Sequence, residues 1–204
     1  MTYKNIREMI FFGLVAIILL IAWKKKIKRK KLFVVSLLVA CMVLLSLSEM
    51  FPVENLFMQF GTPQEVVEYT TKGNVKKVVY GQDSCMVIYS KGNATNNYYF
   101  VPKDGDGYKI PDRFAEKTVY KNLDTTGIIY VYNVRGTKDY YVSVFAYRKG
   151  TKLDILDMNG NQIDVEMDEL FVDSDTMAGR AYFLAEGYSD GYFITINEER
   201  IYIS

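Results

Sequence analysis

Two long apolar runs near the N-terminus constrain the fold of this chain more than any other feature. Residues 9–23 form a run of 15 residues without a charge, and residues 32–48 form a second run of 17. A bilayer core of about 30 Å needs roughly 20 apolar residues in a helix that rises about 1.5 Å per residue. Starting the first run at Ile6 gives 18 residues, and ending the second at Phe51 gives 20. The pattern predicts a transmembrane hairpin with spans at about residues 6–23 and 32–51.

The segment between the two runs, residues 24–31, is strongly basic. Short loops rich in lysine and arginine stay on the cytoplasmic side of a membrane. A cytoplasmic loop between two spans would place both ends of the chain outside the cell. We therefore expect a multi-pass protein of the cell membrane, with the lipid bilayer among its partners and an extracytoplasmic C-terminal domain. The predicted topology anchor is the set of seven basic residues in this loop: Lys24, Lys25, Lys26, Lys28, Arg29, Lys30 and Lys31.

The tetrapeptide Leu-Val-Ala-Cys at residues 38–41 leaves a second interpretation open. It resembles the lipobox of bacterial lipoproteins, in which Cys41 would be lipidated after cleavage. The apolar run continues past Cys41, where a mature lipoprotein usually turns polar, and another apolar run precedes the basic segment. We favour an uncleaved hairpin, and the sequence leaves the lipidation of Cys41 open.

Charge is distributed unevenly along the chain. Residues 1–51 carry nine Lys and Arg against two Glu, whereas residues 52–204 carry 16 basic and 22 acidic side chains, a net charge of −6. A region of that sign should not bind nucleic acid non-specifically. Its 153 residues are enough for one sizeable core or two small ones. The two cysteines, one in each region, are not expected to pair with each other.

A short helix followed by strands is predicted for residues 54–112, which we interpret as a small α+β module. Thr62 has the position of an N-cap, Pro63 suits the first helical turn and Glu65 completes a capping box, so we expect a helix over residues 63–72. Short Val- and Tyr-rich runs separated by Gly, Asn and Asp predict an antiparallel meander at residues 75–80, 84–90, 97–103 and 107–110.

Strand patterns continue without another helix through residues 113–204. Seven or eight short strands over about ninety residues predict an antiparallel β-sandwich of immunoglobulin-like architecture, although the Cys-Trp-Cys signature of true immunoglobulin domains is absent. The seventeen tyrosines of the chain fall mostly on strands. We favour cross-strand packing over a carbohydrate-stacking surface as their role. The expected strands are residues 117–121, 127–134, 140–148, 152–157, 162–167, 180–186, 191–197 and 200–203.

Few residues are candidates for chemistry. The chain has no histidine, which removes histidine-based nucleophile pairs and the commonest metal ligand. Cys85 lies in an apolar strand pattern and is expected to be a small buried residue. We expect no enzyme, no cofactor and no resident metal. An acidic stretch is the one candidate surface for a cation or a partner, although a solvated face explains it better. Its candidate residues are Asp164, Glu166, Asp168, Asp173 and Asp175.

One segment resembles a known kind of module. Thr62-Pro63-Gln64-Glu65-Val66 and Gly107-Tyr108-Lys109-Ile110 occupy the places of a Ser-Pro-Glu-Glu-Ala-like helix start and a Gly-Trp-Lys-Val-like strand. Both are features of a small module of membrane-anchored Gram-positive cell-envelope proteins, and the resemblance covers residues 60–111. It implies an anchored, non-catalytic envelope protein and says nothing about residues 113–204.

These observations predict a membrane-anchored extracytoplasmic binding or interaction protein of a bacterial cell envelope. Its partner would be another protein or a wall polymer. Two alternatives stay open at this point: an accessory subunit of a membrane complex, and a carboxylate-dependent cell-wall hydrolase. The hydrolase would need two acids in a cleft, one of them with a raised pKa.

Overall fold

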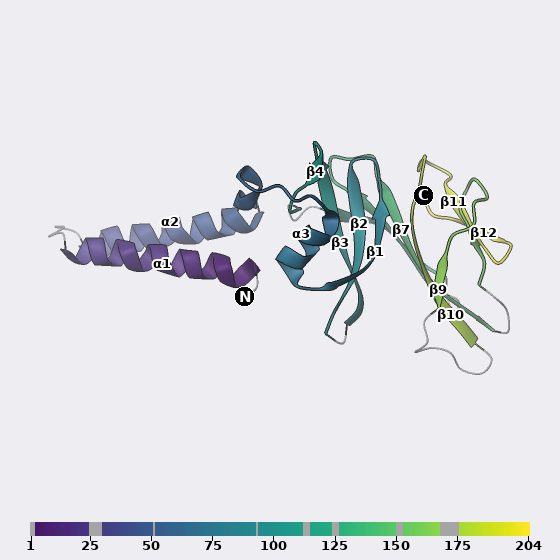
Figure 1. Ribbon diagram of the computed structural model, residues 1–204, viewed down its shortest axis with the longest axis horizontal. Helices are drawn as coiled ribbons and strands as arrows, with labels where there is room; N and C mark the ends of the chain where they lie inside the picture. The colour runs from purple at the N-terminus through teal and green to yellow at the C-terminus, as the bar shows by residue number, and fades with distance from the viewer. Residues whose placement is uncertain are drawn as a thin grey trace. The chain divides into compact units, whose positions relative to one another are not determined.

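The computed structural model of the 204-residue chain (Figure 1) describes residues 3–24, 30–50, 52–92, 94–111, 115–123, 127–149, 153–167 and 176–204. The chain divides into two compact units. Unit 1 comprises residues Met1–Lys76 and Val87–Arg113, and unit 2 comprises residues Lys77–Met86 and Phe114–Ser204. The boundary runs through strands β1 (Asn74–Tyr80) and β2 (Ser84–Lys91), so the tip of this hairpin belongs to unit 2.

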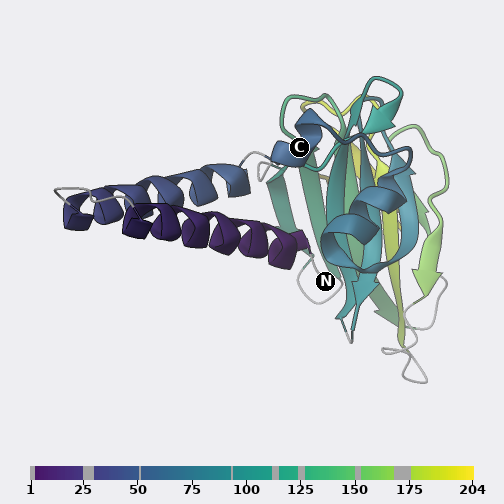
Figure 2. The same cartoon turned by 60° about the vertical axis from the view of Figure 1, so that its left-hand side comes forward.

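Unit 1 begins with two apolar helices, α1 (Tyr3–Lys24) and α2 (Lys30–Met50). Neither contains proline, and Gly13 is the one glycine among their residues, so the Ile- and Leu-rich α1 and the Leu- and Val-rich α2 have no strong helix breaker. The two helices lie side by side as a hairpin in both views (Figures 1 and 2).

The predicted transmembrane hairpin is wrong. Across the described residues, none of the helices combines enough length with enough apolar character to span a lipid bilayer. The physical reason lies at the helix ends, where Arg7, Glu8 and Glu49 fall inside the helices and leave charge-free runs of 15 and 17 residues. Both are shorter than the roughly 20 residues that a bilayer core needs. The spans at 6–23 and 32–51, the multi-pass cell-membrane localisation and the extracytoplasmic assignment are therefore corrected.

This correction also removes the predicted role of residues 24–31 as a topology anchor, because that role requires two membrane spans. Lys24 is the last residue of α1 and is exposed, and Lys30 and Lys31 begin α2. The other members of the predicted anchor lie outside the described residues: Lys25, Lys26, Lys28 and Arg29.

A short 3-10 helix, η1 (Val53–Leu56), leads to helix α3 (Pro63–Thr71), which forms where the capping pattern predicts. Thr62 Oγ1 accepts a hydrogen bond from Glu65 N at 3.3 Å, and Glu65 Oε2 accepts one from Gly61 N at 2.9 Å. Val66 and Val67 are fully buried on the inner face of α3. The helix ends at Lys72, which adopts the left-handed conformation (φ 57°). The helix predicted for residues 63–72 therefore ends one residue earlier than expected.

The predicted meander is confirmed as a four-stranded sheet. Strands β1 and β2 are followed by β3 (Ala94–Asp104) and β4 (Gly107–Tyr108), and the sheet order is β1-β2-β3-β4. Val87, Ile88 and Val101 are completely buried in it. Consecutive strands therefore pair in chain order, as short connections favour.

Unit 2 contains two further antiparallel sheets. The larger has the order β5-β6-β7-β10-β9 and the smaller β12-β11-β8. Their strands are β5 (Ala115–Asn122), β6 (Gly127–Val134), β7 (Tyr140–Lys149), β8 (Ile155–Leu156), β9 (Val165–Met167), β10 (Thr176–Leu184), β11 (Phe193–Ile196) and β12 (Glu199–Tyr202). Three successive strands, β5, β6 and β7, pair in one sheet. An immunoglobulin domain places its third strand in the opposite sheet, so the immunoglobulin-like prediction is wrong.

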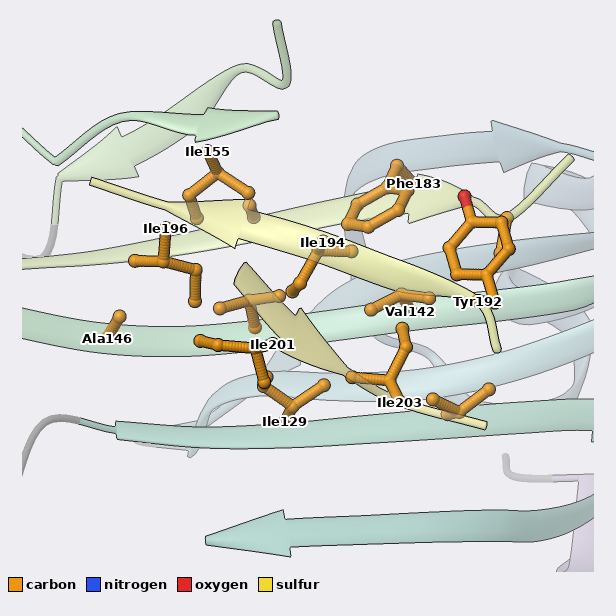
Figure 3. Close-up of a cluster of buried hydrophobic side chains, with 14 of the residues drawn as sticks. Ile129, Val142, Ala146, Ile155, Phe183, Tyr192, Ile194, Ile196, Ile201 and Ile203 are labelled. Atoms are coloured by element: carbon orange, nitrogen blue, oxygen red, sulfur yellow. The ribbon is translucent and has the colours of Figure 1, made fainter. Parts of the chain in front are cut away.

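One apolar core joins the two sheets of unit 2, which is compatible with the predicted sandwich. Along β6, Ile129 and Val131 are fully buried while Tyr130 and Tyr132 on the other face are not. Isoleucines of the small sheet lie against these residues (Figure 3). A fully buried side chain of this size contributes about 1.5–3 kcal/mol. The labelled members of the cluster are Ile129, Val142, Ala146, Ile155, Phe183, Tyr192, Ile194, Ile196, Ile201 and Ile203.

Candidate functional site

The predicted acidic surface is represented by two described residues. Asp164 and Glu166 are both exposed at β9, on either side of half-buried Val165. Glu166 lies 3.7 Å from Lys77 Nζ, which offsets part of its charge. The part of the chain that the structure describes contains no group of three metal-ligating side chains. The remaining predicted members lie outside the described residues: Asp168, Asp173 and Asp175.

Two neighbouring acids stabilise a turn. Asp157 Oδ1 accepts hydrogen bonds from Asn159 N at 2.9 Å and Asn161 N at 2.7 Å. Asp154 Oδ1 accepts one from the side-chain amide of Gln162 at 2.8 Å. A glycosidase needs two carboxyl groups that face each other across the scissile bond. These two acids instead hold local structure, so they give the hydrolase alternative no support.

A buried carboxylate that the sequence analysis missed organises one end of unit 2. Asp139 is 4 % exposed and lies just before β7. Its carboxylate accepts hydrogen bonds from Gln82 N at 2.9 Å, Asp83 N at 2.8 Å and Ser84 Oγ at 2.7 Å. Gln82 and Asp83 lie in the turn between β1 and β2, and Ser84 is the first residue of β2. Asp139 therefore holds a turn that precedes it by more than 50 residues in the chain. We call Asp139 together with its partners Gln82, Asp83 and Ser84 the clamp.

Tyr141 contacts the clamp from the interior of the protein, through Ser84. Its hydroxyl lies 2.9 Å from Ser84 Oγ, and its side chain is completely buried. The serine hydroxyl has one proton and donates it to Asp139, so Tyr141 must donate to Ser84. Burial raises the pKa of Tyr141 well above its usual value, with the nearby Asp139 charge as a smaller cause. The phenol therefore stays protonated and serves as a hydrogen-bond donor.

The clamp leaves no space for a larger residue at Gly81. An added Cβ at Gly81 would lie 2.5 Å from Tyr141 Oη and 2.6 Å from the Asp139 carboxyl carbon. The turn that carries Asp139 is itself braced, because Asn133 Nδ2 donates to Asp139 O at 3.1 Å and Thr137 Oγ1 donates to Val134 O at 2.8 Å. Both turns that the clamp joins are thus held by hydrogen bonds.

A pocket of about 590 Å³ opens beside the clamp, within the size range of small-ligand sites. The stack of Tyr140 on Tyr188, with centroids 4.3 Å apart, supports one side, and the Tyr188 hydroxyl donates to Ile203 O at 2.7 Å. The aromatic faces and the Asp139 oxygens are thus engaged within the protein. The pocket is lined by Tyr80, Gly81, Gln82, Lys138, Asp139, Leu184, Ala185, Glu186, Gly187 and Tyr188.

A second candidate site is a row of aromatic rings on the outer face of β5 and β6, which we call the tyrosine platform and define as Lys117, Tyr120, Tyr130 and Tyr132. Tyr120 pairs with Tyr130 across the two strands, and their ring centroids are 5.4 Å apart. Tyr130 and Tyr132 follow at 6.1 Å, with their planes 28° apart. Lys117 Nζ lies 4.0 Å from the Tyr130 ring centroid and 4.6 Å from that of Tyr120.

The third candidate is the outer surface of α1 and α2, which is apolar nearly all round. Phe12 is 66 % exposed, Trp23 78 % and Met42 61 %. A helix that is hydrophobic on every side is normally buried. The other large apolar residues exposed on these helices are Met9, Leu14, Ile17, Leu19, Leu20, Ile21, Phe33, Val35, Leu38, Val39 and Val43.

No protein-family model, curated protein or solved structure matches the chain. The resemblance of residues 60–111 to an envelope module stays a prediction. The function is therefore inferred from the side chains of the three candidate sites.

Proposed function

We propose that this protein is a non-enzymatic interaction protein, an accessory subunit that docks onto a protein partner through α1 and α2. The observation that supports the proposal is the apolar surface of these helices. Proteins that stay monomeric rarely expose contiguous apolar patches larger than a few hundred Å². Covering a large side chain such as Phe12 or Met42 contributes about 1.5–3 kcal/mol, so covering several of them favours association strongly.

The turn that follows α2 also exposes large apolar side chains. Leu56 is 86 % exposed and Phe57 is 74 % exposed. Asn55 holds this turn against unit 1, because its side-chain amide donates to Ile110 O at 2.8 Å and accepts from Ile110 N at 3.0 Å. Phe57 N also donates to Glu54 O at 3.1 Å. Two large apolar side chains on a braced turn need little ordering on binding, which favours a docking role.

The absence of histidine from the sequence supports the non-enzymatic part of the proposal. The buried carboxylate of Asp139 is occupied by turn donors, and Tyr141 is held as a neutral donor. A general acid or base needs a proton-exchanging group within reach of a substrate. These two groups are committed to structure instead.

The test is the mass of the full chain in detergent-free buffer, measured by size-exclusion chromatography with light scattering. The wild type should elute well above the monomer mass of 23.5 kDa or with a co-purified partner. Replacing exposed residues of both helices by glutamine, which keeps helix propensity, should restore the monomer. We suggest the quadruple variant Phe12→Gln, Leu20→Gln, Val35→Gln and Met42→Gln.

A matched control places glutamine at exposed large side chains of unit 2. Met158 is 44 % exposed, Met167 45 % and Tyr202 52 %. The variant Met158→Gln, Met167→Gln and Tyr202→Gln should remain assembled like the wild type. A wild-type chain that runs as a clean 23.5 kDa monomer would refute the proposal.

A further inference from the structure

The tyrosine platform is built differently from the buried parts of the same sheet. Its rings lie opposite the core residues of β6, Ile129 and Val131, so they are not needed to fill the core. Tyr120 is 53 % exposed, although burying an aromatic ring is strongly favourable. The ring centroids of the cross-strand pair Tyr120 and Tyr130 are 5.4 Å apart, and those of Tyr130 and Tyr132, two residues apart on β6, are 6.1 Å apart. The result is a half-exposed aromatic strip on a rigid sheet.

Lys117 gives the strip a defined charge. Its amine lies over the rings of Tyr130 and Tyr120 at 4.0 Å and 4.6 Å, where the negative face of each ring attracts it. Lys117 makes no ion pair with any residue that the structure describes. The amine is therefore oriented by the rings while its N–H donors remain available to an anion.

We propose that the tyrosine platform binds an anionic polysaccharide. The C–H face of a sugar ring packs on the exposed ring of Tyr120, and the carboxylate of a neighbouring sugar pairs with Lys117, whose amine lies over Tyr130 and Tyr120. An exposed aromatic ring beside a single cation matches a chain of sugars in which only some rings are charged. The site is independent of the apolar helices, so it adds a ligand to the proposed interaction protein.

Charge density distinguishes the proposed ligand from a nucleic acid. Aromatic strips with basic residues also bind single-stranded DNA and RNA, whose dense phosphates need several cations for affinity. The platform supplies one amine, and residues 52–204 carry a net charge of −6. A polysaccharide that carries a carboxylate on every second sugar has about half as many charges per ring as a single-stranded nucleic acid, so it is repelled less by the net negative charge of this region.

Strand β5 lies at the edge of its sheet, but it is poorly suited to pairing with a strand of another protein. The register of β5 against β6 shifts between Lys117 and Val119, and Thr118 Oγ1 donates to Val131 O at 3.1 Å. A bulge and a lysine on an edge strand both oppose pairing with another strand. The binding capacity of this part of the sheet therefore lies in its face.

The experiment is affinity electrophoresis of the full chain through gels that contain one polymer each. Hyaluronate supplies sugar rings with a carboxylate on every second ring, dextran supplies rings alone, poly-L-glutamate supplies charge alone, and oligo-dT supplies bases and phosphates. Hyaluronate should retard the wild type most. Tyr120→Ser should weaken that retardation at least fivefold. Lys117→Gln should reduce the retardation by hyaluronate to that by dextran.

Two variants keep the result interpretable. Tyr120→Phe retains the ring and should bind like the wild type. Tyr202→Ser changes a tyrosine of similar exposure, 52 %, on the other sheet of unit 2 and should also bind like the wild type. Far-UV circular dichroism checks that each variant is folded. The proposal is overturned if Tyr120→Ser and Tyr202→Ser behave alike, if poly-L-glutamate retards as strongly as hyaluronate, or if oligo-dT retards most.

Discussion

Replacing Asp139 by alanine should release the turn between β1 and β2. The substitution removes the acceptor of three hydrogen bonds, from Gln82 N, Asp83 N and Ser84 Oγ, all between 2.7 Å and 2.9 Å. Ser84 is completely buried and would keep its hydroxyl without this acceptor. The donors cannot all turn to water, so the change should destabilise the folded turn and not merely loosen it.

The size of the effect follows from these three bonds. A hydrogen bond to a charged group contributes about 1.5–3 kcal/mol, and unpairing a buried polar group costs about 1–3 kcal/mol. Because such contributions do not add fully, we expect about 3–5 kcal/mol for Asp139→Ala. Asp139→Asn keeps one acceptor oxygen and should cost about half as much. Tyr141→Phe removes a single donor and should cost about 1 kcal/mol.

Hydrogen–deuterium exchange with mass spectrometry measures this change locally. Each 1.4 kcal/mol is a tenfold change in an opening equilibrium, so peptides covering residues 80–86 should exchange about a hundredfold to a few thousandfold faster in Asp139→Ala. Asp83→Ala is the control, since Asp83 is exposed and contributes its backbone N–H to the clamp, which alanine retains. Equal exchange in the two variants would refute the clamp.

Three further changes test other parts of the structure. Gly81→Ala should destabilise the chain because its Cβ meets Tyr141 and Asp139, whereas Gly61→Ala, whose nearest neighbour is 3.7 Å away, should leave the urea midpoint unchanged or raised. Thr62→Ala removes the cap of α3 and should lower the free energy of unfolding by about 1 kcal/mol, with Thr62→Ser retaining it. Burial raises the pKa of Tyr192 to about 12 from an ordinary value near 10. The folded state therefore resists its ionisation, so this stabilisation is complete below pH 10 and is lost as the pH rises toward 12. A urea midpoint that stays constant from pH 10 to pH 12 would contradict it.

Local patterns predict the individual elements well. The capping box around Thr62 and Glu65 locates the start of α3, and alternation along residues 127–134 separates the buried and outward faces of β6. Both signals act within a few residues, where propensity and periodicity decide. The observed end of α3 differs from the predicted end at residue 72. Lys72 itself takes the left-handed conformation that a glycine usually supplies at a helix end.

Contacts between distant segments are not visible in local patterns. Asp139 is one of many acids in the sequence, and its role depends on donors 55 to 57 residues away. The period of two predicts that Tyr130 and Tyr132 share a face, but their proximity to Tyr120 depends on the strand register. The immunoglobulin-like order failed for the same reason, because strand count does not determine which strands pair.

The transmembrane hairpin was predicted wrongly because the lengths of its apolar spans were overestimated. Including residues beyond the charge-free runs, from Ile6 and to Phe51, lengthened the predicted spans to 18 and 20 residues. Those extensions contain Arg7, Glu8 and Glu49. The apolar composition of both helices was predicted, and it accounts for their exposed apolar surface.

The most direct test of the interaction role uses Trp23, the one tryptophan of the chain, which is 78 % exposed on α1 in the isolated protein. Acrylamide quenching of its fluorescence in detergent-free buffer reports whether a partner, including a second copy, covers this surface. The proposed docking role predicts a protected tryptophan with blue-shifted emission in the wild type, and free quenching in the quadruple glutamine variant. A wild-type Trp23 that is quenched as readily as free N-acetyltryptophanamide would contradict it.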